Sequence, residues 1–333
     1  MAAQRVLGPE AGAELAYRRG LVWLAAGNAS AAREPLERAA ALAPERVDAR
    51  LALAQAQVEL GEAQAAVATL GGILAVSPVP AELARARRIL AAAVRRAEPP
   101  LAGEAEQDLT RLLAALERGE ANDGDLARAT ALARSHVHPR VLTVAGLVAW
   151  RRGLEREATR LLNEAAALNP LDGEAQRVLG AAHYTAQRPR DALAPLKEAL
   201  RRNPFDAEVA RMLAAAATTE GDLEAAAAAY RRLTVLEPSV AEHHLWLART
   251  ERRLGRLSEA RLAASRGAAL KGDNVPLWVE LASLEAQLAH EAPTPHERDD
   301  AHQRGQEALS KLMTLAPNHP AAAAITAQLD GKR

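Results

Sequence analysis

The chain has 333 residues, and its 42 Lys and Arg residues balance its 42 Asp and Glu residues, so it has no general attraction for nucleic acid or for an anionic membrane. It contains no Cys, which excludes disulfides, thiolate metal sites and Cys nucleophiles. Aromatic residues make up only 2%, whereas the strong helix formers Ala, Leu, Arg and Glu are abundant, so the composition predicts a nearly all-α chain.

The N-terminal segment, from Met1 to Pro9, has no basic stretch followed by an apolar stretch, as a signal peptide would. No segment reaches the roughly 18 consecutive apolar residues of a membrane-spanning helix. We therefore expect a cytoplasmic protein without direct membrane insertion. A periplasmic location is the alternative if an N-terminal anchor has been removed. Richness in Ala, Arg and Leu is typical of GC-rich genomes and favours a bacterial source.

Helix-breaking residues recur along the chain at a fixed period. The spacing is 34 residues from Pro44 to Pro78, and again between Pro170, Pro204 and Pro238. A period of this length with a breaker at each end is typical of helix–turn–helix units. A turn Gly is expected between the two helices of a unit, where left-handed backbone is cheapest for Gly. These glycines are Gly27, Gly61, Gly153, Gly221 and Gly255.

Small and large apolar residues also stand in register within each period. Examples are Gly20, Ala32 and Leu36, then Gly146, Ala158 and Leu162, then Gly180, Ala192 and Leu196. These segments resemble the tetratricopeptide repeat (TPR) family, with its pattern W-x₂-L-G-x₂-Y…A-x₃-F…P. The resemblance covers about six clear repeats, at 13–78, 140–170 and 171–272, and a stretched seventh at 275–317. It implies an all-α, right-handed superhelical solenoid.

Two segments interrupt the repeats. An extra helix is predicted at 81–97, closed by Pro99-Pro100, which we interpret as a hinge, and a degenerate repeat follows at 104–136. A polar insert near 291–300 is expected to form a loop between two helices. The predicted organisation is a repeat pair at 1–78, the extra helix and hinge at 79–103, a second array at 104–317, and a capping helix and tail at 318–333.

The TPR resemblance implies a concave surface lined by the first helix of each repeat. The predicted partner-binding residues on it are Trp150, Arg177, Tyr184, Arg211, Arg249, Arg252 and Arg253. Two aromatic rings and several guanidinium forks suit an extended acidic peptide, because each fork matches a carboxylate. No Asn stands at the inward positions, so a strict clamp of Lys, Arg and Asn is not expected. The alternative is that these arginines solvate an exposed face and pair with neighbouring acids.

Nothing in the sequence indicates catalysis or a bound cofactor. Neither G-x-S-x-G, nor H-E-x-x-H, nor a Gly-rich phosphate loop occurs. The nine histidines lack metal-ligand spacing, so no metal is expected. The basic helix at 81–97 has no interleaved aromatic residues, and we interpret its arginines as a solvated face, not a nucleic-acid site. They are Arg85, Arg87, Arg88, Arg95 and Arg96.

These observations predict a non-catalytic scaffold or adaptor that holds a peptide or partner protein and supports assembly of a larger complex. Two alternatives remain. In the first, the chain is an accessory subunit that recruits substrate proteins to a separate enzyme. In the second, it is a structural homo-oligomer in which the helix at 81–97 or the insert at 291–300 docks against another copy.

Overall fold

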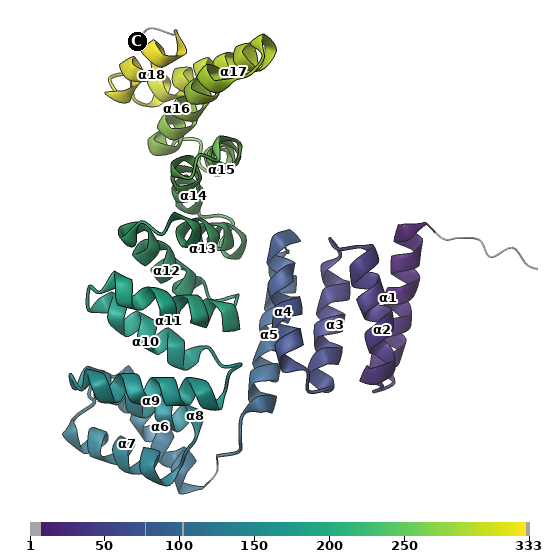
Figure 1. Ribbon diagram of the computed structural model, residues 1–333, viewed down its shortest axis with the longest axis vertical. Helices are drawn as coiled ribbons and strands as arrows, with labels where there is room; N and C mark the ends of the chain where they lie inside the picture. Colours follow the sequence, from purple (N-terminus) through teal and green to yellow (C-terminus); the bar gives the residue numbers. More distant parts are fainter. Residues whose placement is uncertain (1–7, 77, 102, 331–333) are drawn as a thin grey trace, which may run out of the picture. The chain divides into compact units, whose positions relative to one another are not determined.

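A computed structural model describes residues 8–76, 78–101 and 103–330, and the regular structure over these residues is entirely helical (Figure 1). The helices are α1 (Pro9–Ala25), α2 (Ala29–Leu42), α3 (Val47–Glu59), α4 (Ala63–Gly72), the 3₁₀ helix η1 (Ile73–Val76), α5 (Pro80–Ala97), α6 (Glu104–Glu117), α7 (Asp123–Ser135), α8 (Pro139–Arg151), α9 (Glu155–Leu168), α10 (Glu174–Thr185), α11 (Pro189–Arg202), α12 (Ala207–Glu220), α13 (Leu223–Leu236), α14 (Ala241–Arg253), α15 (Leu257–Leu270), α16 (Val275–Glu291), α17 (Pro295–Leu315) and α18 (Ala321–Leu329). The predicted all-α repeat fold is confirmed. None of the helices in these ranges combines the length and apolar character needed to cross a membrane. Residues 1–7, on which much of the signal-peptide argument rested, lie outside the description.

The chain divides into two compact units, unit 1 at 1–209 and unit 2 at 210–333, so the division falls within α12. In unit 1, consecutive helices pair as α1 with α2, α3 with α4, α8 with α9 and α10 with α11, and α5 packs on both α3 and α4. In unit 2, α14 pairs with α15 and α16 with α17, and α18 packs on both members of the last pair. The extra helix and the capping helix were predicted from the sequence, and both are present. The domain boundaries predicted at 79–103 and 318 stay predictions.

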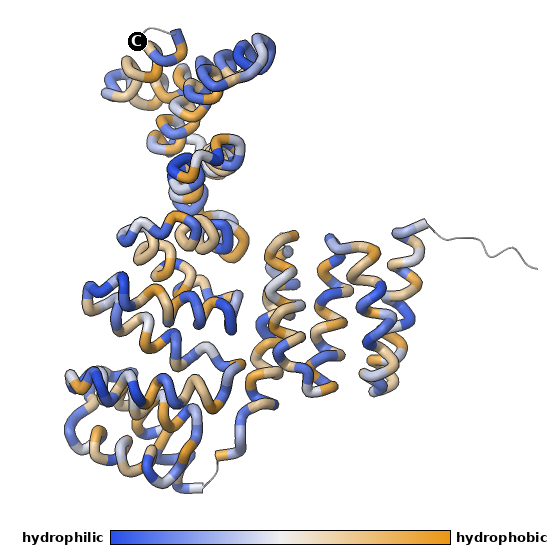
Figure 2. Tube along the Cα trace, viewed as in Figure 1, coloured by the Kyte–Doolittle hydropathy of each residue, from blue (hydrophilic) through white to orange (hydrophobic). Residues whose placement is uncertain are grey.

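Three of the pairs, α1–α2, α8–α9 and α10–α11, pack through a Gly on the first helix and a Leu on the second. Figure 2 shows that apolar residues recur along the helices between polar ones. A Cβ atom added at Gly146 would lie 2.7 Å from Leu162 Cγ, and one added at Gly180 would lie 2.6 Å from Leu196 Cδ2. Both leucines are fully buried. The absence of a side chain therefore lets the second helix approach closely.

The turns inside the pairs have left-handed backbone at the predicted positions. The φ angles of Gly27, Gly61, Gly153, Gly221 and Gly255 lie between 71° and 78°. Gln187 occupies the equivalent position of the α10–α11 pair and has a φ of 58°. The sequence analysis did not predict a left-handed residue here, because the α10–α11 pair has no Gly at this position. Gln187 adopts the same left-handed conformation, at the steric cost that a residue with a Cβ atom pays there.

The loop predicted over 291–300 is wrong. α16 continues to Glu291 and α17 begins at Pro295, so only residues 292–294 lie outside the two helices. The extra residues lengthen the pair to helices of 17 and 21 residues, against 13 and 14 in the preceding pair. Thr294 caps the new N-terminus by accepting a hydrogen bond from the Glu297 N–H at 3.2 Å, and Pro295 suits the first helical position. The polar residues from 295 to 300 therefore belong to the first turns of a capped helix and not to a loop.

A buried His138 fastens the segment around the predicted hinge to the start of α8. Its Nε2 lies 2.9 Å from the Pro99 carbonyl oxygen, and its Nδ1 accepts a hydrogen bond from the Arg140 N–H at 3.2 Å. Since Nδ1 accepts, the Nε2–H form donates to Pro99. Both ring nitrogens thus serve the local structure, which accounts for a buried histidine at this position.

Candidate peptide-binding surfaces

In unit 1 the predicted surface is built from the end of α8 and the face of α10. Trp150 is half-buried, and its ring meets His183 edge-on, with centroids 5.1 Å apart and planes at 80°. The guanidinium carbon of Arg188 lies 5.5 Å from the Trp150 ring centroid. The ring that packs on Trp150 is that of His183, the residue before the predicted Tyr184. Tyr184 is half-buried on the same helix.

The surroundings of His183 favour its neutral form. Burial lowers its pKa, and the positive charge of Arg188 lowers it further. Its Nδ1 and the Nη2 of Arg188 are buried and have no hydrogen-bond partner among the described residues. Arg188 is fixed by a 2.9 Å hydrogen bond to Glu155, in the preceding helix pair. The cluster therefore presents an aromatic ring beside a fixed cation.

Arg177, the third predicted residue of unit 1, already holds a carboxylate. Its Nε and Nη2 donate to the two oxygens of Glu174 at 2.7 and 2.6 Å, and Glu208 lies 3.9 Å away. The hydrogen bond to Glu174 raises the pKa of Arg177. The sequence analysis gave pairing with a neighbouring acid as the alternative role of these arginines, and Arg177 is paired in this way.

The predicted arginines of unit 2 are also largely paired. Arg211 donates to Glu237, which lies 2.7 Å from His243 Nε2 as well. Arg249 and Arg252 converge on one carboxylate, that of the buried Glu280, at 3.5 and 3.3 Å. Arg253 is exposed, and the described part of the chain supplies no ion pair for it. The structure therefore brings Arg249 and Arg252 together and leaves Arg253 apart.

Trp246 is a surface residue that the sequence analysis did not single out. Its side chain is 42% exposed, stacks on Tyr230 with planes 15° apart, and carries the Arg249 guanidinium 5.1 Å from its centroid. An exposed Trp with a stacked cation is a frequent interface element. Trp246 does not fall on the 34-residue spacing that relates Trp150 to Tyr184.

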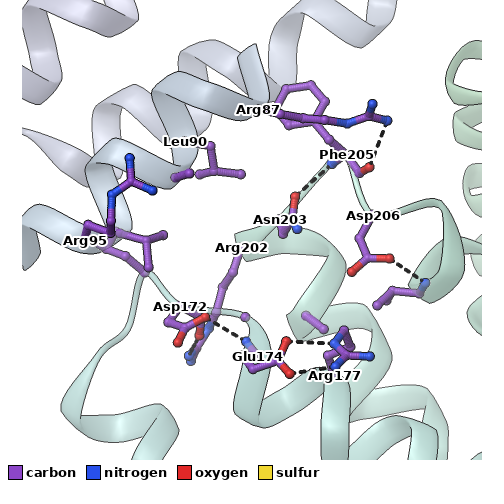
Figure 3. A pocket seen from close by; sticks show the side chains of 16 residues that line it. Arg87, Leu90, Arg95, Asp172, Glu174, Arg177, Arg202, Asn203, Phe205 and Asp206 are labelled. Atoms are coloured by element: carbon purple, nitrogen blue, oxygen red, sulfur yellow. Dashed lines mark hydrogen bonds and ion pairs between the residues drawn. The ribbon is translucent and has the colours of Figure 1, made fainter. Parts of the chain in front are cut away.

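A pocket of about 420 Å³ lies in unit 1 between α5 and the α10–α12 region (Figure 3). One wall is a single face of α5, formed by Arg87, Leu90, Ala91, Val94 and Arg95. The other walls come from the start of α10, the end of α11 and the loop that leads into α12. They are formed by Leu171, Asp172, Gly173, Glu174, Arg177, Ala199, Arg202, Asn203, Phe205, Asp206 and Val209. Phe205, the one Phe of the sequence, is only 3% exposed there.

Charges line this pocket on both sides. Four arginines and three acids contribute to it, and Arg177 is shared with the predicted surface of α10. Burial raises the pKa of Asp172, whose carboxylate also accepts a 2.9 Å hydrogen bond from the Glu174 N–H. The sequence analysis interpreted Arg87 and Arg95 as part of a solvated face, and both are indeed exposed, yet both also border this pocket.

Arg202 lines the pocket and also links two helix pairs. Its Nη1 donates to the carbonyl oxygens of Ala166, Asn169 and Asp172 at 3.2, 3.4 and 3.0 Å. Glu198 holds the same guanidinium through Nε at 2.7 Å and also pairs with Arg201. Hydrogen bonds from Arg201 and then Arg202 lower the pKa of Glu198 to about 2.

The variant Glu198→Gln should lower the stability of unit 1 at neutral pH, by no more than about 1 kcal/mol since the site is partly exposed. A carboxyl with a depressed folded-state pKa stabilises above its unfolded value of about 4.3, and the effect is lost as the pH falls to about 2. Thermal unfolding of both proteins between pH 7 and pH 2 checks this. The gap between the two Tm values should close over that acidic range, and a gap independent of pH would contradict the assignment.

Over the described residues, no group of three or more His, Asp or Glu side chains is arranged to hold a metal ion. The polar chemistry found here consists of ion pairs, hydrogen bonds and stacked rings.

Comparison with known proteins agrees with the repeat architecture. Models of the tetratricopeptide repeat match residues 24–90 and, in three overlapping segments, 143–207, 179–236 and 211–275. None of the curated protein sequences is significantly similar to the chain.

Among solved structures, the chain is similar to YrrB, a TPR protein with an unusual peptide-binding site, at 14% identity and a TM-score of 0.44, over 60% of this chain and 97% of that one. It is also similar to MamA, at 19% identity and a TM-score of 0.38, over 54% and 95% of the two chains. The matched repeat models together span more than half of the chain. The chain thus belongs to the tetratricopeptide repeat family, whose members are typically non-catalytic and generally mediate protein–protein interactions.

Proposed function

We propose that the chain is an adaptor that binds an acidic peptide, or an acidic segment of a partner protein, on the first helices of its repeats and so supports assembly of a larger complex. In unit 1 the contact residues are Trp150, Arg177 and Tyr184. In unit 2 they are Arg211, Arg249, Arg252 and Arg253. The observation that carries the proposal is that each unit presents arginine and aromatic side chains on its first helices: Arg177 and the Trp150–His183 cluster in unit 1, and Arg249 over the Trp246 ring in unit 2.

The internal partners of these arginines do not prevent ligand binding. Exposed ion pairs contribute only about 0–1 kcal/mol, so a ligand carboxylate can replace Glu174 on Arg177 at little cost. Arg249 and Arg252 share one acid at distances beyond 3.2 Å, which leaves guanidinium N–H groups free to donate. Because the helices are fixed by stacking, few side chains must be ordered on binding.

The test is a pull-down from a native lysate with the wild-type chain and with Arg177→Glu/Arg211→Glu, read by mass spectrometry. Reversing two charges should deplete the acidic partners at least about tenfold, because like charges then face the ligand. A suitable control is Arg160→Glu/Arg298→Glu, which changes two exposed arginines on the second helices α9 and α17.

Retention of the same partners by the first-helix variant would refute the proposed surface. Equal losses in both double variants would reveal a nonspecific charge effect and refute it too. Recovery of the chain alone, together with a mass above the monomer by light scattering, would favour the self-assembling alternative.

A further inference from the structure

The helix α5 has one buried face and one face that borders the pocket. Leu83, Ala86 and Ala93 of this helix are buried, and the helix packs against α3 and α4. Arg87, Ala91, Val94 and Arg95 follow one another on the adjacent face and border the pocket, with Leu90 shared between the two sides. An extra helix that only capped the first repeats would need just the first of these faces.

The uncommitted charge in this pocket is positive. Arg87 makes a single long hydrogen bond, 3.5 Å from its Nη2 to the Phe205 carbonyl oxygen. Arg95 has no side-chain partner within the described ranges, and Figure 3 shows it beside the cavity with no bond drawn to it.

The carboxylates on the opposite walls already accept hydrogen bonds from neighbouring groups. Both oxygens of Glu174 are bound by Arg177, at 2.7 and 2.6 Å. Asp206 accepts from the Val209 N–H at 3.0 Å, and Asp172 accepts from the Glu174 N–H at 2.9 Å. These bonds tie the carboxylates to their own helix starts. A ligand that enters the pocket therefore meets two arginines that lack an acidic partner, on an aliphatic wall.

The spacing of these arginines sets the length of the ligand. Eight residues of helix separate Arg87 from Arg95, which is about 12 Å along the axis. An extended peptide covers about 13 Å in four residues, and residues i, i+2 and i+4 point to the same side. Two acids at i and i+4 thus match the two arginines, while the side chain at i+2 lies over Leu90, Ala91 and Val94. A volume of about 420 Å³ is in the usual range for ligand pockets.

We propose that this pocket is a second recognition site, which binds an extended peptide of the pattern acid–x–aliphatic–x–acid through Arg87 and Arg95 of α5. The inference rests on the proposed peptide-binding function but uses a different helix. A nucleic acid fits the site less well, because the one aromatic residue of the pocket, Phe205, is buried and offers no exposed ring on which a base could stack.

The experiment measures binding of a fluorescein-labelled peptide, Glu-Ser-Leu-Ser-Glu with blocked ends, to the full chain by fluorescence anisotropy. The chain provides a matched control, since Arg88 and Arg96 have the same eight-residue spacing and are exposed but do not line the pocket. Arg87→Glu/Arg95→Glu should weaken binding by about tenfold or more, and Arg88→Glu/Arg96→Glu by less than about twofold. Replacing both Glu residues of the peptide with Gln, or its Leu with Ser, should weaken binding to the wild type as well.

Equal weakening by the two double variants would overturn the site, as would the absence of saturable binding to the wild-type chain. Displacement of the peptide by an oligothymidylate at lower concentration than by unlabelled peptide would overturn the peptide assignment in favour of nucleic acid. The pull-down with Arg177→Glu/Arg211→Glu is read independently. If it succeeds while the peptide fails to bind, only the α5 site is refuted, and the converse result refutes only the surface on the first helices.

Discussion

Replacing Leu196 with Ala should lower the free energy of unfolding of unit 1 by about 3 kcal/mol, because the change leaves a cavity where a fully buried side chain fills the space over Gly180. Gly180→Ala should also destabilise, by about 1–3 kcal/mol, through overpacking. The new Cβ would lie 2.6 Å from Leu196 Cδ2 and 3.2 Å from the Leu196 backbone N. The two effects share one cause and should not add. In the Leu196→Ala background, most of the cost of Gly180→Ala should disappear, since the crowding methyl groups are gone.

Urea denaturation gives the free energies, and amide hydrogen exchange read by mass spectrometry locates the loss in α10 and α11. Local readout matters in a repeat array, because each helix pair depends mainly on its neighbours. Gly12→Ala serves as the control, since a Cβ there meets Leu42 Cδ1 at an ordinary 3.5 Å. It should stabilise α1 slightly, because Ala favours helix over Gly. Strict additivity at 180 and 196 would contradict the packing described here.

The second large effect is expected at a buried acid of unit 2. Glu251 is 1% exposed, and its Oε1 accepts hydrogen bonds from Arg231 Nε and Nη2 at 3.0 and 2.6 Å. Arg256 reaches the other oxygen from 3.5 Å. Arg231→Met should cost about 3 kcal/mol, because within the described part of the chain it leaves the buried carboxylate with only the longer contact to Arg256, at 3.5 Å. The double variant Arg231→Met/Glu251→Met should recover most of this loss, since well-packed apolar side chains can replace a buried ion pair.

The matched control for this prediction is Arg160→Met. Arg160 pairs with Glu157 and Glu164 at 2.7 and 2.8 Å, but on an exposed surface. Its loss should cost less than about 1 kcal/mol. Urea denaturation of the three variants checks the ranking. If Arg231→Met costs no more than Arg160→Met, burial of the acid has no energetic consequence and the prediction is wrong.

The sequence predicted the residues of a partner-binding surface, but it did not predict their contacts. It placed seven residues on first helices but did not identify the carboxylates that face them. Glu280 lies 31 residues after Arg249 along the sequence, on the first helix of the next repeat. Which acid meets which arginine depends on side-chain orientation between stacked repeats, and a pattern of residue types does not encode that orientation. The packing of His183 on Trp150 depends on the same orientation and was not predicted.

The sequence by itself determined the repeat, the left-handed turn glycines, the extra helix and the capping helix, because all of these follow from local propensity and from packing between residues a short distance apart along the chain. Leu196 and Gly180, for example, are 16 residues apart. Only the tertiary structure decided that the loop from 203 to 206 lies against α5, where Arg87 bonds to Phe205 across 118 residues of sequence. Contacts between helices so far apart leave no period in the sequence. A basic helix that reads as a solvated face can therefore line a pocket once the chain has folded.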